Sequence, residues 1–173
     1  MPEPLVEVLA DDPRWSGAGI EAIAERSARA ALAASGLDPA RYEIALLACD
    51  DARITALNAE FRGRGAPTNV LSWPAPEGPV PDAAAGDGRA FLGDLALAFE
   101  TCAAEAAAAG IGLADHAAHL VVHGVLHLLG HDHGDDVEAG AMETLETNVL
   151  ASMGIANPYS AQERPSGAAS GQE

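Results

Sequence analysis

The sequence predicts an α+β (or α/β) fold in which a single mixed sheet of about four strands is covered by helices. The chain has 173 residues, the size of one ordinary domain, and 49% of its residues are hydrophobic, which is enough to build a core. Short apolar runs alternate with helical patterns in the first half, and helical patterns accumulate in the second half. We therefore expect residues 1–159 to form one domain.

Four short apolar runs are the predicted strands. They cover residues 5–9, 42–49, 70–73 and 91–99. The first run is followed by Asp11-Asp12-Pro13, and the third is stopped by Pro74, because proline cannot donate a backbone hydrogen bond to a sheet. The segment 74–90 is rich in Pro, Gly, Ala and Asp, and it is predicted to be an exposed loop.

Five segments show the apolar spacing of helices. The first begins near Ile20 and ends at Gly36, a residue type that favours a helix C-terminus. The second follows a potential cap at Asp50. Its predicted buried side consists of Ile54, Leu57 and Phe61. An alanine-rich helix then runs to Gly110, and a very apolar helix covers about residues 113–129.

The fifth helix starts at Asp135 or Asp136 and ends at Gly154. Its predicted buried side consists of Val137, Ala141, Leu145 and Val149. Residues 160–173 contain almost no large apolar side chain, so we expect them to be a disordered tail.

The charge of the chain limits its partners. The formal net charge is −17, which repels polyanions at long range and argues against indiscriminate nucleic-acid binding, so no DNA partner is expected. Cys49 and Cys102 are too few for a disulfide framework and are predicted to be small buried hydrophobes. Neither a secretory pattern nor an apolar run of membrane-spanning length is visible, so a cytoplasmic protein without a membrane partner is expected.

All six histidines lie between positions 116 and 133. His123 and His127 are four residues apart and therefore adjacent on one helical face, the spacing that presents two ring nitrogens to one ion. Gly130 lets the chain leave the helix, so His133 can return as a third ligand. Three imidazoles leave a fourth position for water, which is typical of a catalytic zinc site with one ion per chain.

The other polar residues of this segment have less specific predicted roles. His131 and Asp132 are possible alternative ligands, although a role in supporting the ligands or in the turn is favoured for both. His116 and His119 lie earlier on the same helical stripe, and they are expected to make structural hydrogen bonds, with a place in the cleft as the second option.

Residues 123–133 also fit the metzincin pattern H-E-x-x-H-x-x-G-x-x-H at every position but one. Gly124 stands where the protease carries its glutamate general base, and glycine cannot accept a proton. The predicted metal ligands are therefore retained without the peptidase base, which makes peptide hydrolysis the weaker hypothesis.

The segment HLVVHGVLHLLGHDH, residues 119–133, resembles the signature of the YbeY family, bacterial endoribonucleases known as rRNA maturation factors. Further matching blocks are NAEFRG at 58–63, PTNVLSWP at 67–74, LGD at 92–94 and, more weakly, NPY at 157–159. The resemblance implies that His123, His127 and His133 bind zinc and that Arg62 matches an arginine the family needs for function. It also implies cleavage of single-stranded RNA, maturation of the small-subunit rRNA 3′ end and ribosome quality control, with the small ribosomal subunit and its assembly proteins as partners.

Such chemistry is physically reasonable for these residues. A metal ion polarises a phosphoryl oxygen or activates water, and a guanidinium binds phosphate oxygens in a bidentate manner. Arg62 and Arg64 are the candidates for that cation because they lie in a glycine-rich turn just before a predicted strand. The sequence does not distinguish between metal hydroxide and the RNA 2′-OH as the nucleophile, and it identifies no general base.

Two other functions are possible alternatives to a zinc endoribonuclease. One is a metalloprotease of metzincin-like geometry, which Gly124 disfavours. The other is a non-catalytic ribosome assembly factor that contains zinc, which a closed site with a fourth protein ligand would favour.

Overall fold

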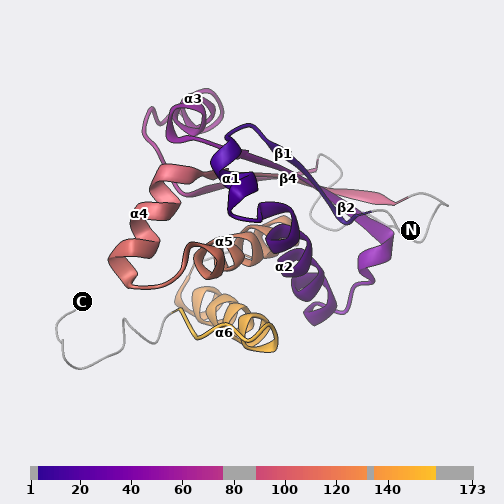
Figure 1. Cartoon of the computed structure of the whole chain (residues 1–173). Helices are drawn as coiled ribbons and strands as arrows, with labels where there is room; N and C mark the ends of the chain where they lie inside the picture. Colours follow the sequence, from indigo (N-terminus) through magenta and orange to yellow (C-terminus); the bar gives the residue numbers. More distant parts are fainter. Residues whose placement is uncertain (1–3, 76–88, 132–134, 159–173) are drawn as a thin grey trace.

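The computed structural model describes residues 4–75, 89–131 and 135–158, and Figure 1 shows the arrangement of its elements. Within these residues a four-stranded sheet has the strand order β1-β2-β4-β3. The strands are β1 Val6–Ala10, β2 Tyr42–Cys49, β3 Val70–Pro74 and β4 Ala90–Ala98. β1, β2 and β4 run parallel, and β3 pairs with β4 in the antiparallel direction. The predicted mixed sheet and the α+β class are confirmed.

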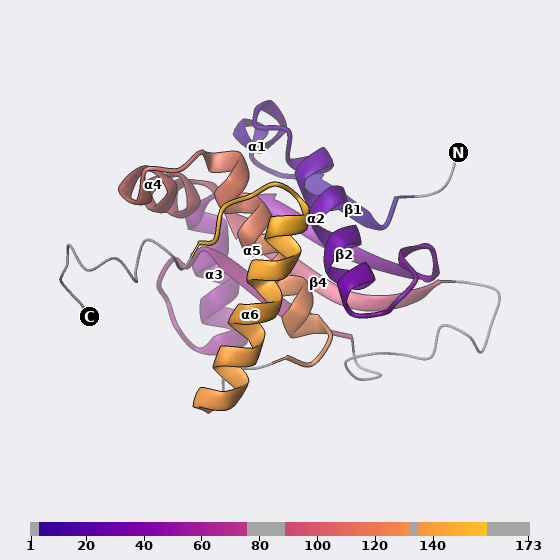
Figure 2. The same ribbon diagram turned by 90° about the horizontal axis from the view of Figure 1, so that it is seen from below.

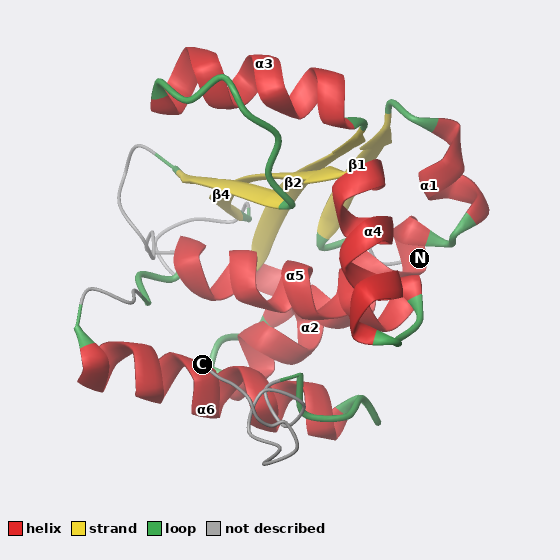
Figure 3. Ribbon diagram, turned by 90° about the vertical axis from the view of Figure 1, so that its left-hand side faces the viewer, coloured by secondary structure: helices red, strands yellow, loops and turns green. Residues whose placement is uncertain are grey.

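Helices cover the two faces of this sheet unequally, as Figure 3 shows. Of the described helices, α3 lies over one face, whereas α2 and α5 lie against the other and α6 forms an outer layer behind them (Figures 2 and 3). The helices of the described residues are α1 Pro13–Gly17, α2 Ile20–Ala34, α3 Asp51–Arg62, α4 Phe99–Ala109, α5 Leu113–Leu128 and α6 Asp136–Ser152, with a short 3₁₀ helix η1 Pro39–Arg41.

The central strands are buried on both faces because of this layering. On the side of α2 and α5, Ile44, Leu46, Leu95 and Leu97 join the main core. On the side of α3 the apolar layer is smaller. Its buried members are Cys49, Ile54, Leu71, Ala96 and Ala98. The core is therefore built mostly from aliphatic side chains, in keeping with an aromatic content of 4%.

Local sequence signals define several helix ends as predicted. The carboxylates of Asp50 and Asp135 accept hydrogen bonds from the backbone N–H groups of Arg53 and Glu138, so they cap α3 and α6. After α2, Gly36 has a φ of 77°, and the N–H of Leu37 donates to the carbonyl of Leu32 over 2.9 Å. These bonds satisfy backbone groups that a helix end leaves without partners.

The predicted buried sides of two helices are confirmed only in part. Ile54 and Val149 are buried, and Leu57 and Leu145 are partly buried, but the other predicted members are exposed. In α3 the last turn extends past the apolar layer, so Phe61 is 57% exposed and packs against Trp73 at a ring separation of 5.7 Å. In α6, Val137 is 81% exposed, and Ala141 is also exposed. Besides the predicted Val149, the buried residues of α6 are Met142, Glu146 and Leu150.

Glu25 on α2 holds the start of the first strand. Its two carboxylate oxygens accept hydrogen bonds from the backbone N–H groups of Leu5 and Val6 over 2.9 and 3.0 Å, and Arg29 donates to it over 2.6 Å. Burial opposes ionisation of this carboxyl, but the hydrogen bonds outweigh it and lower the pKa of Glu25. The ionised form therefore ties α2 to β1.

Both cysteines are buried and free, as predicted. Burial raises the pKa of Cys49 and of Cys102 to about 12, so neither is a reactive thiolate near neutral pH. Most of the predicted 74–90 loop and the whole predicted 160–173 tail lie outside the described residues. No described helix is both long and apolar enough to cross a membrane.

Candidate active site

Helix α5 carries a row of imidazoles through the interior of the protein. It contacts the sheet and the helices α2, α4 and α6, and nine of its 16 residues are buried. His116, His119, His123 and His127 follow one another along a single side of this helix and are half-buried. The predicted apolar helix with a histidine stripe is confirmed, and each imidazole needs a polar partner because water is largely excluded.

The imidazole at the start of the row is bound by a carboxylate of α4. His116 Nε2 lies 2.8 Å from Glu105 Oε1, and the same oxygen accepts a hydrogen bond from Asn69 Nδ2 over 2.9 Å. This is the kind of structural hydrogen bond that was expected for His116.

The next two imidazoles share one carboxylate from α6. Glu146 is fully buried, and its Oε1 lies 3.1 Å from His119 Nε2, while its Oε2 lies 2.6 Å from His123 Nδ1. An ionised carboxylate can only accept hydrogen bonds, so this contact fits the tautomers in which the facing ring nitrogens carry the hydrogen. His123 is thus held by its Nδ1 atom, which directs Nε2 away from Glu146.

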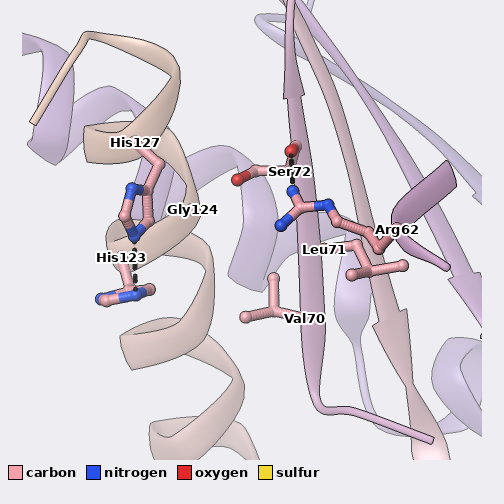
Figure 4. Close-up of a pocket in the computed structure, with 7 residues that line it drawn as sticks. All are labelled: Arg62, Val70, Leu71, Ser72, His123, Gly124 and His127. Atoms are coloured by element: carbon pink, nitrogen blue, oxygen red, sulfur yellow. Dashed lines mark hydrogen bonds between the residues drawn. The ribbon is translucent and has the colours of Figure 1, made fainter. Parts of the chain in front are cut away.

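The Nε2 atoms of His123 and His127 converge at the end of the row. They are 3.1 Å apart, and the two rings meet at nearly a right angle, with centroids 4.6 Å apart (Figure 4). Two nitrogens bound to one tetrahedral zinc at ~2.0–2.1 Å would be separated by roughly 3.4 Å. The spacing of this imidazole pair is therefore compatible with a shared metal ion.

The rest of the predicted ligand set cannot be placed. His133, the predicted third ligand, and Asp132, a possible alternative, lie outside the described residues. Among the residues that are described, no group of three potential ligands comes together around one point.

A cavity of about 160 Å³ lies between the imidazole pair and strand β3. Its described lining residues are Arg62, Val70, Leu71, Ser72, His123, Gly124 and His127. Arg62 reaches the cavity from the end of α3, on the side opposite the imidazoles, and its Nη2 donates to the carbonyl oxygen of Ser72 over 2.8 Å (Figure 4). The structure thus places His123, His127 and Arg62, all singled out from the sequence, in the lining of one cavity.

Gly124 lets α5 approach the sheet closely at this cavity. A Cβ atom built on Gly124 would lie 2.8 Å from Leu95 Cδ2 and 3.6 Å from Val70 Cγ2, so even alanine would overlap with the β4 side chain. Gly124 therefore has a packing role, in addition to lacking the side chain that a metzincin-like peptidase would need.

The two secondary candidates that lie within the described residues are less closely associated with the cavity. Arg64 is exposed, its backbone N–H donates to Asn58 O over 3.1 Å, and the described lining of the cavity does not include it. His131 follows the end of α5 and is half-buried, and its backbone N–H donates to Leu126 O over 3.0 Å. Neither contact assigns a role to the side chain.

Comparison with known proteins identifies the family. The model of the family described as endoribonuclease YbeY matches residues 10–154. The chain belongs to the YbeY family. Curated relatives named endoribonuclease YbeY include those of Dinoroseobacter shibae, 52% identical over 89% of this chain and 90% of the relative, and of Ruegeria pomeroyi, 52% identical over 89% and 97%.

The fold of this YbeY family member also occurs among solved structures. The solution structure of a Thermotoga maritima protein matches with a TM-score of 0.54 and 18% identity, covering 86% of this chain and 91% of that one. At this identity the likeness supports the fold alone.

Sequence reasoning missed two groups that shape the site in this member of the YbeY family. Glu146 was not singled out, although it binds two imidazoles of the row, and the backbone carbonyl of Ser72 was not foreseen as the anchor of Arg62. A signal for Glu146 was present, because it lies four residues after Met142 and three before Val149 on the apolar face of α6.

Proposed function

We propose that this chain is a zinc-dependent endoribonuclease that cleaves single-stranded RNA in maturation of the small-subunit rRNA 3′ end and in ribosome quality control, in the cytoplasm. Membership of the YbeY family supports the reaction class. The observation that carries the site assignment is the cavity with two converging imidazole nitrogens on one wall and a guanidinium on the other.

The metal would be held by His123 and His127, with His133 as the third ligand proposed from its spacing in the sequence. Neutral imidazoles are ligands that zinc prefers, and the 3.1 Å between the two Nε2 atoms suits a shared ion. When bound, zinc would supply Lewis-acid polarisation of a phosphoryl oxygen or a water molecule of lowered pKa.

Arg62 would bind the phosphodiester from the side opposite the metal ligands. A guanidinium has five N–H donors, and the Nη2 bond to the Ser72 carbonyl occupies one of them while it orients the group. The other donors can contact the non-bridging oxygens, where negative charge increases in the transition state. Arg62 would thus be both a binding and a transition-state-stabilising residue.

Substrate selection would depend on docking to the small ribosomal subunit and its assembly proteins. The net charge of −17 gives the chain no long-range attraction for free RNA, so a docked position must supply the local concentration of substrate. A metzincin-like protease is the less suitable function, because Gly124 provides no general base and its Cβ direction is filled by Leu95. If the chain binds zinc but does not cleave RNA, it would instead be a non-catalytic assembly factor that contains zinc.

The decisive experiment is single-turnover cleavage of a single-stranded RNA with the small-subunit 3′ sequence, with and without a chelator and with zinc restored. We expect cleavage only with zinc, and much slower cleavage of the same RNA in a duplex. His127→Ala should lose most bound zinc and all cleavage. Cleavage that continues undiminished in chelator, or full zinc content in His127→Ala, would contradict the metal assignment.

Arg62→Ala tests the opposite wall of the cavity. The side chain is exposed apart from its bond to Ser72, so zinc content and melting temperature should stay near those of the parent. Cleavage should fall at least 100-fold, which corresponds to about 2.7 kcal/mol of transition-state stabilisation. Arg62→Lys should restore little, because an ammonium group cannot make the planar two-pronged contact.

Arg53→Ala is the matched control for this substitution. It removes the same charge from the same helix, but Arg53 pairs with Asp11 over 3.8 Å and does not belong to the described lining of the cavity. Its cleavage rate should equal that of the parent. Equal losses in both variants would mean that Arg62 acts only through the net charge of the chain.

A further inference from the structure

The carboxylate that lies behind the imidazole row has no role in the function proposed so far. Glu146 is fully buried in α6, yet both of its carboxylate oxygens point at ring nitrogens of α5. A carboxylate buried without hydrogen-bond partners is strongly destabilised, so the two imidazole contacts offset part of the cost of burying Glu146 inside the core.

We propose that Glu146 is a positioning residue that fixes the tautomer and the orientation of His123 for metal binding. This inference rests on the proposed function, in that His123 is taken as a zinc ligand. Glu146 Oε2 lies 2.6 Å from Nδ1 of His123, so the ring hydrogen is placed on Nδ1. Nε2, at the other end of the ring, then presents a lone pair toward His127 Nε2, 3.1 Å away.

His119 fixes the carboxylate itself. Its Nε2 donates to Oε1 over 3.1 Å, so Glu146 is held between two rings that are one helical turn apart on α5. The carboxylate cannot rotate without losing one of these bonds. Glu146, His123 and a bound metal would form the general carboxylate–histidine–metal arrangement. In this arrangement the outer carboxylate orients the histidine ligand and makes it more basic.

A purely structural role for Glu146 would be to attach α6 to α5, which are packed together. That role predicts a change in stability only. A positioning role predicts a change in zinc affinity and a defined ring tautomer. The two roles are therefore separated by measurements other than the melting temperature.

The first measurement is the zinc Kd of the full-length protein, determined by competition with a chromophoric chelator. Glu146→Gln keeps the size of the side chain but replaces one acceptor oxygen by an N–H₂ donor. We expect its Kd for zinc to rise about 10–100-fold, the range typical for loss of an outer carboxylate partner. A Kd within twofold of the parent value would overturn the proposal.

Glu105→Gln is the matched control. Glu105 accepts from His116 on the same side of α5 over 2.8 Å, but His116 is outside the proposed ligand set. Its zinc Kd should stay within twofold of the parent. An equal weakening in both variants would show a general loss of negative charge, and it would overturn a specific role for Glu146.

The second measurement needs no substitution at Glu146 and remains decisive if Glu146→Gln does not fold. Long-range ¹H–¹⁵N spectra of the zinc-free parent protein report which nitrogen of the His123 ring carries the hydrogen. We expect the Nδ1–H form, and a dominant Nε2–H form would overturn the proposal. If the parent binds no zinc, the proposed function fails, while this spectrum still tests the position of the ring hydrogen.

Discussion

The close approach of α5 to the sheet at Gly124 gives a quantitative prediction about stability. In Gly124→Ala the new Cβ would lie 2.8 Å from Leu95 Cδ2, whereas an ordinary contact is 3.4–4 Å. Overpacking of a core in this way destabilises by about 1–3 kcal/mol. The better helix propensity of alanine stabilises by about 1 kcal/mol. We therefore expect a net loss of up to about 2 kcal/mol.

Urea denaturation of the full-length variants measures this balance. The control is Gly140→Ala in α6, where a Cβ meets nothing within 4 Å, so only the gain from helix propensity applies and the variant should be slightly more stable than the parent. In a Leu95→Ala background the overlapping atom is gone, and Gly124→Ala should become stabilising. In this double-mutant cycle, we expect the change in the free energy of unfolding caused by Gly124→Ala to have opposite signs in the two backgrounds.

Stabilisation by Gly124→Ala in the parent background, equal to that of Gly140→Ala, would refute the packing argument. In that case α5 would not be held against β4 as closely as the contact indicates. If the added Cβ displaces α5 from the sheet, Gly124→Ala should also lower cleavage, because His123 is the preceding residue and its Nε2 faces the cavity.

Three further predictions concern other parts of the chain. Binding of free single-stranded RNA should be weak with a shallow salt dependence, measured by fluorescence anisotropy, because the chain has a net charge of −17. The lowered pKa of Glu25 means that its stabilising contribution is present above the ordinary glutamate pKa, about 4.3, and is lost as the pH falls below it, so Glu25→Gln should flatten this acid-side loss of stability in urea titrations. Cys49 and Cys102 should resist alkylation at pH 8 in the native protein and react in urea, because both thiols are buried with raised pKa values.

The imidazole pair could be predicted from the sequence because its geometry is local. Residues four apart on a helix are neighbours whatever the helix packs against, so His123 and His127 needed no knowledge of the tertiary fold. Arg62 was named from its loop and its family resemblance. Its position opposite the imidazoles depends on the antiparallel pairing of β3 with β4, which no local pattern specifies.

The errors at Phe61 and Val137 have a common physical cause. An apolar residue at helical spacing is buried only where neighbouring elements cover that turn, and these two residues lie in the terminal turns of their helices, where they stay 57% and 81% exposed. Glu146 was missed for the opposite reason. Glutamate is rarely fully buried, and its two imidazole partners are 23 and 27 residues away in the sequence, so its spacing on the apolar face of α6 was not enough to predict its burial.

The two walls of the cavity differ in how firmly the fold holds them. His123 and His127 belong to α5, which is packed between the sheet and the outer helix, so the backbone amides of its buried core should exchange with deuterium only through global unfolding. Arg62 belongs to an exposed helix end, with exposed residues on both sides, whose amides should exchange through local opening. We therefore expect any movement that accompanies substrate binding to occur on the guanidinium side, while the geometry of the imidazole pair stays unchanged.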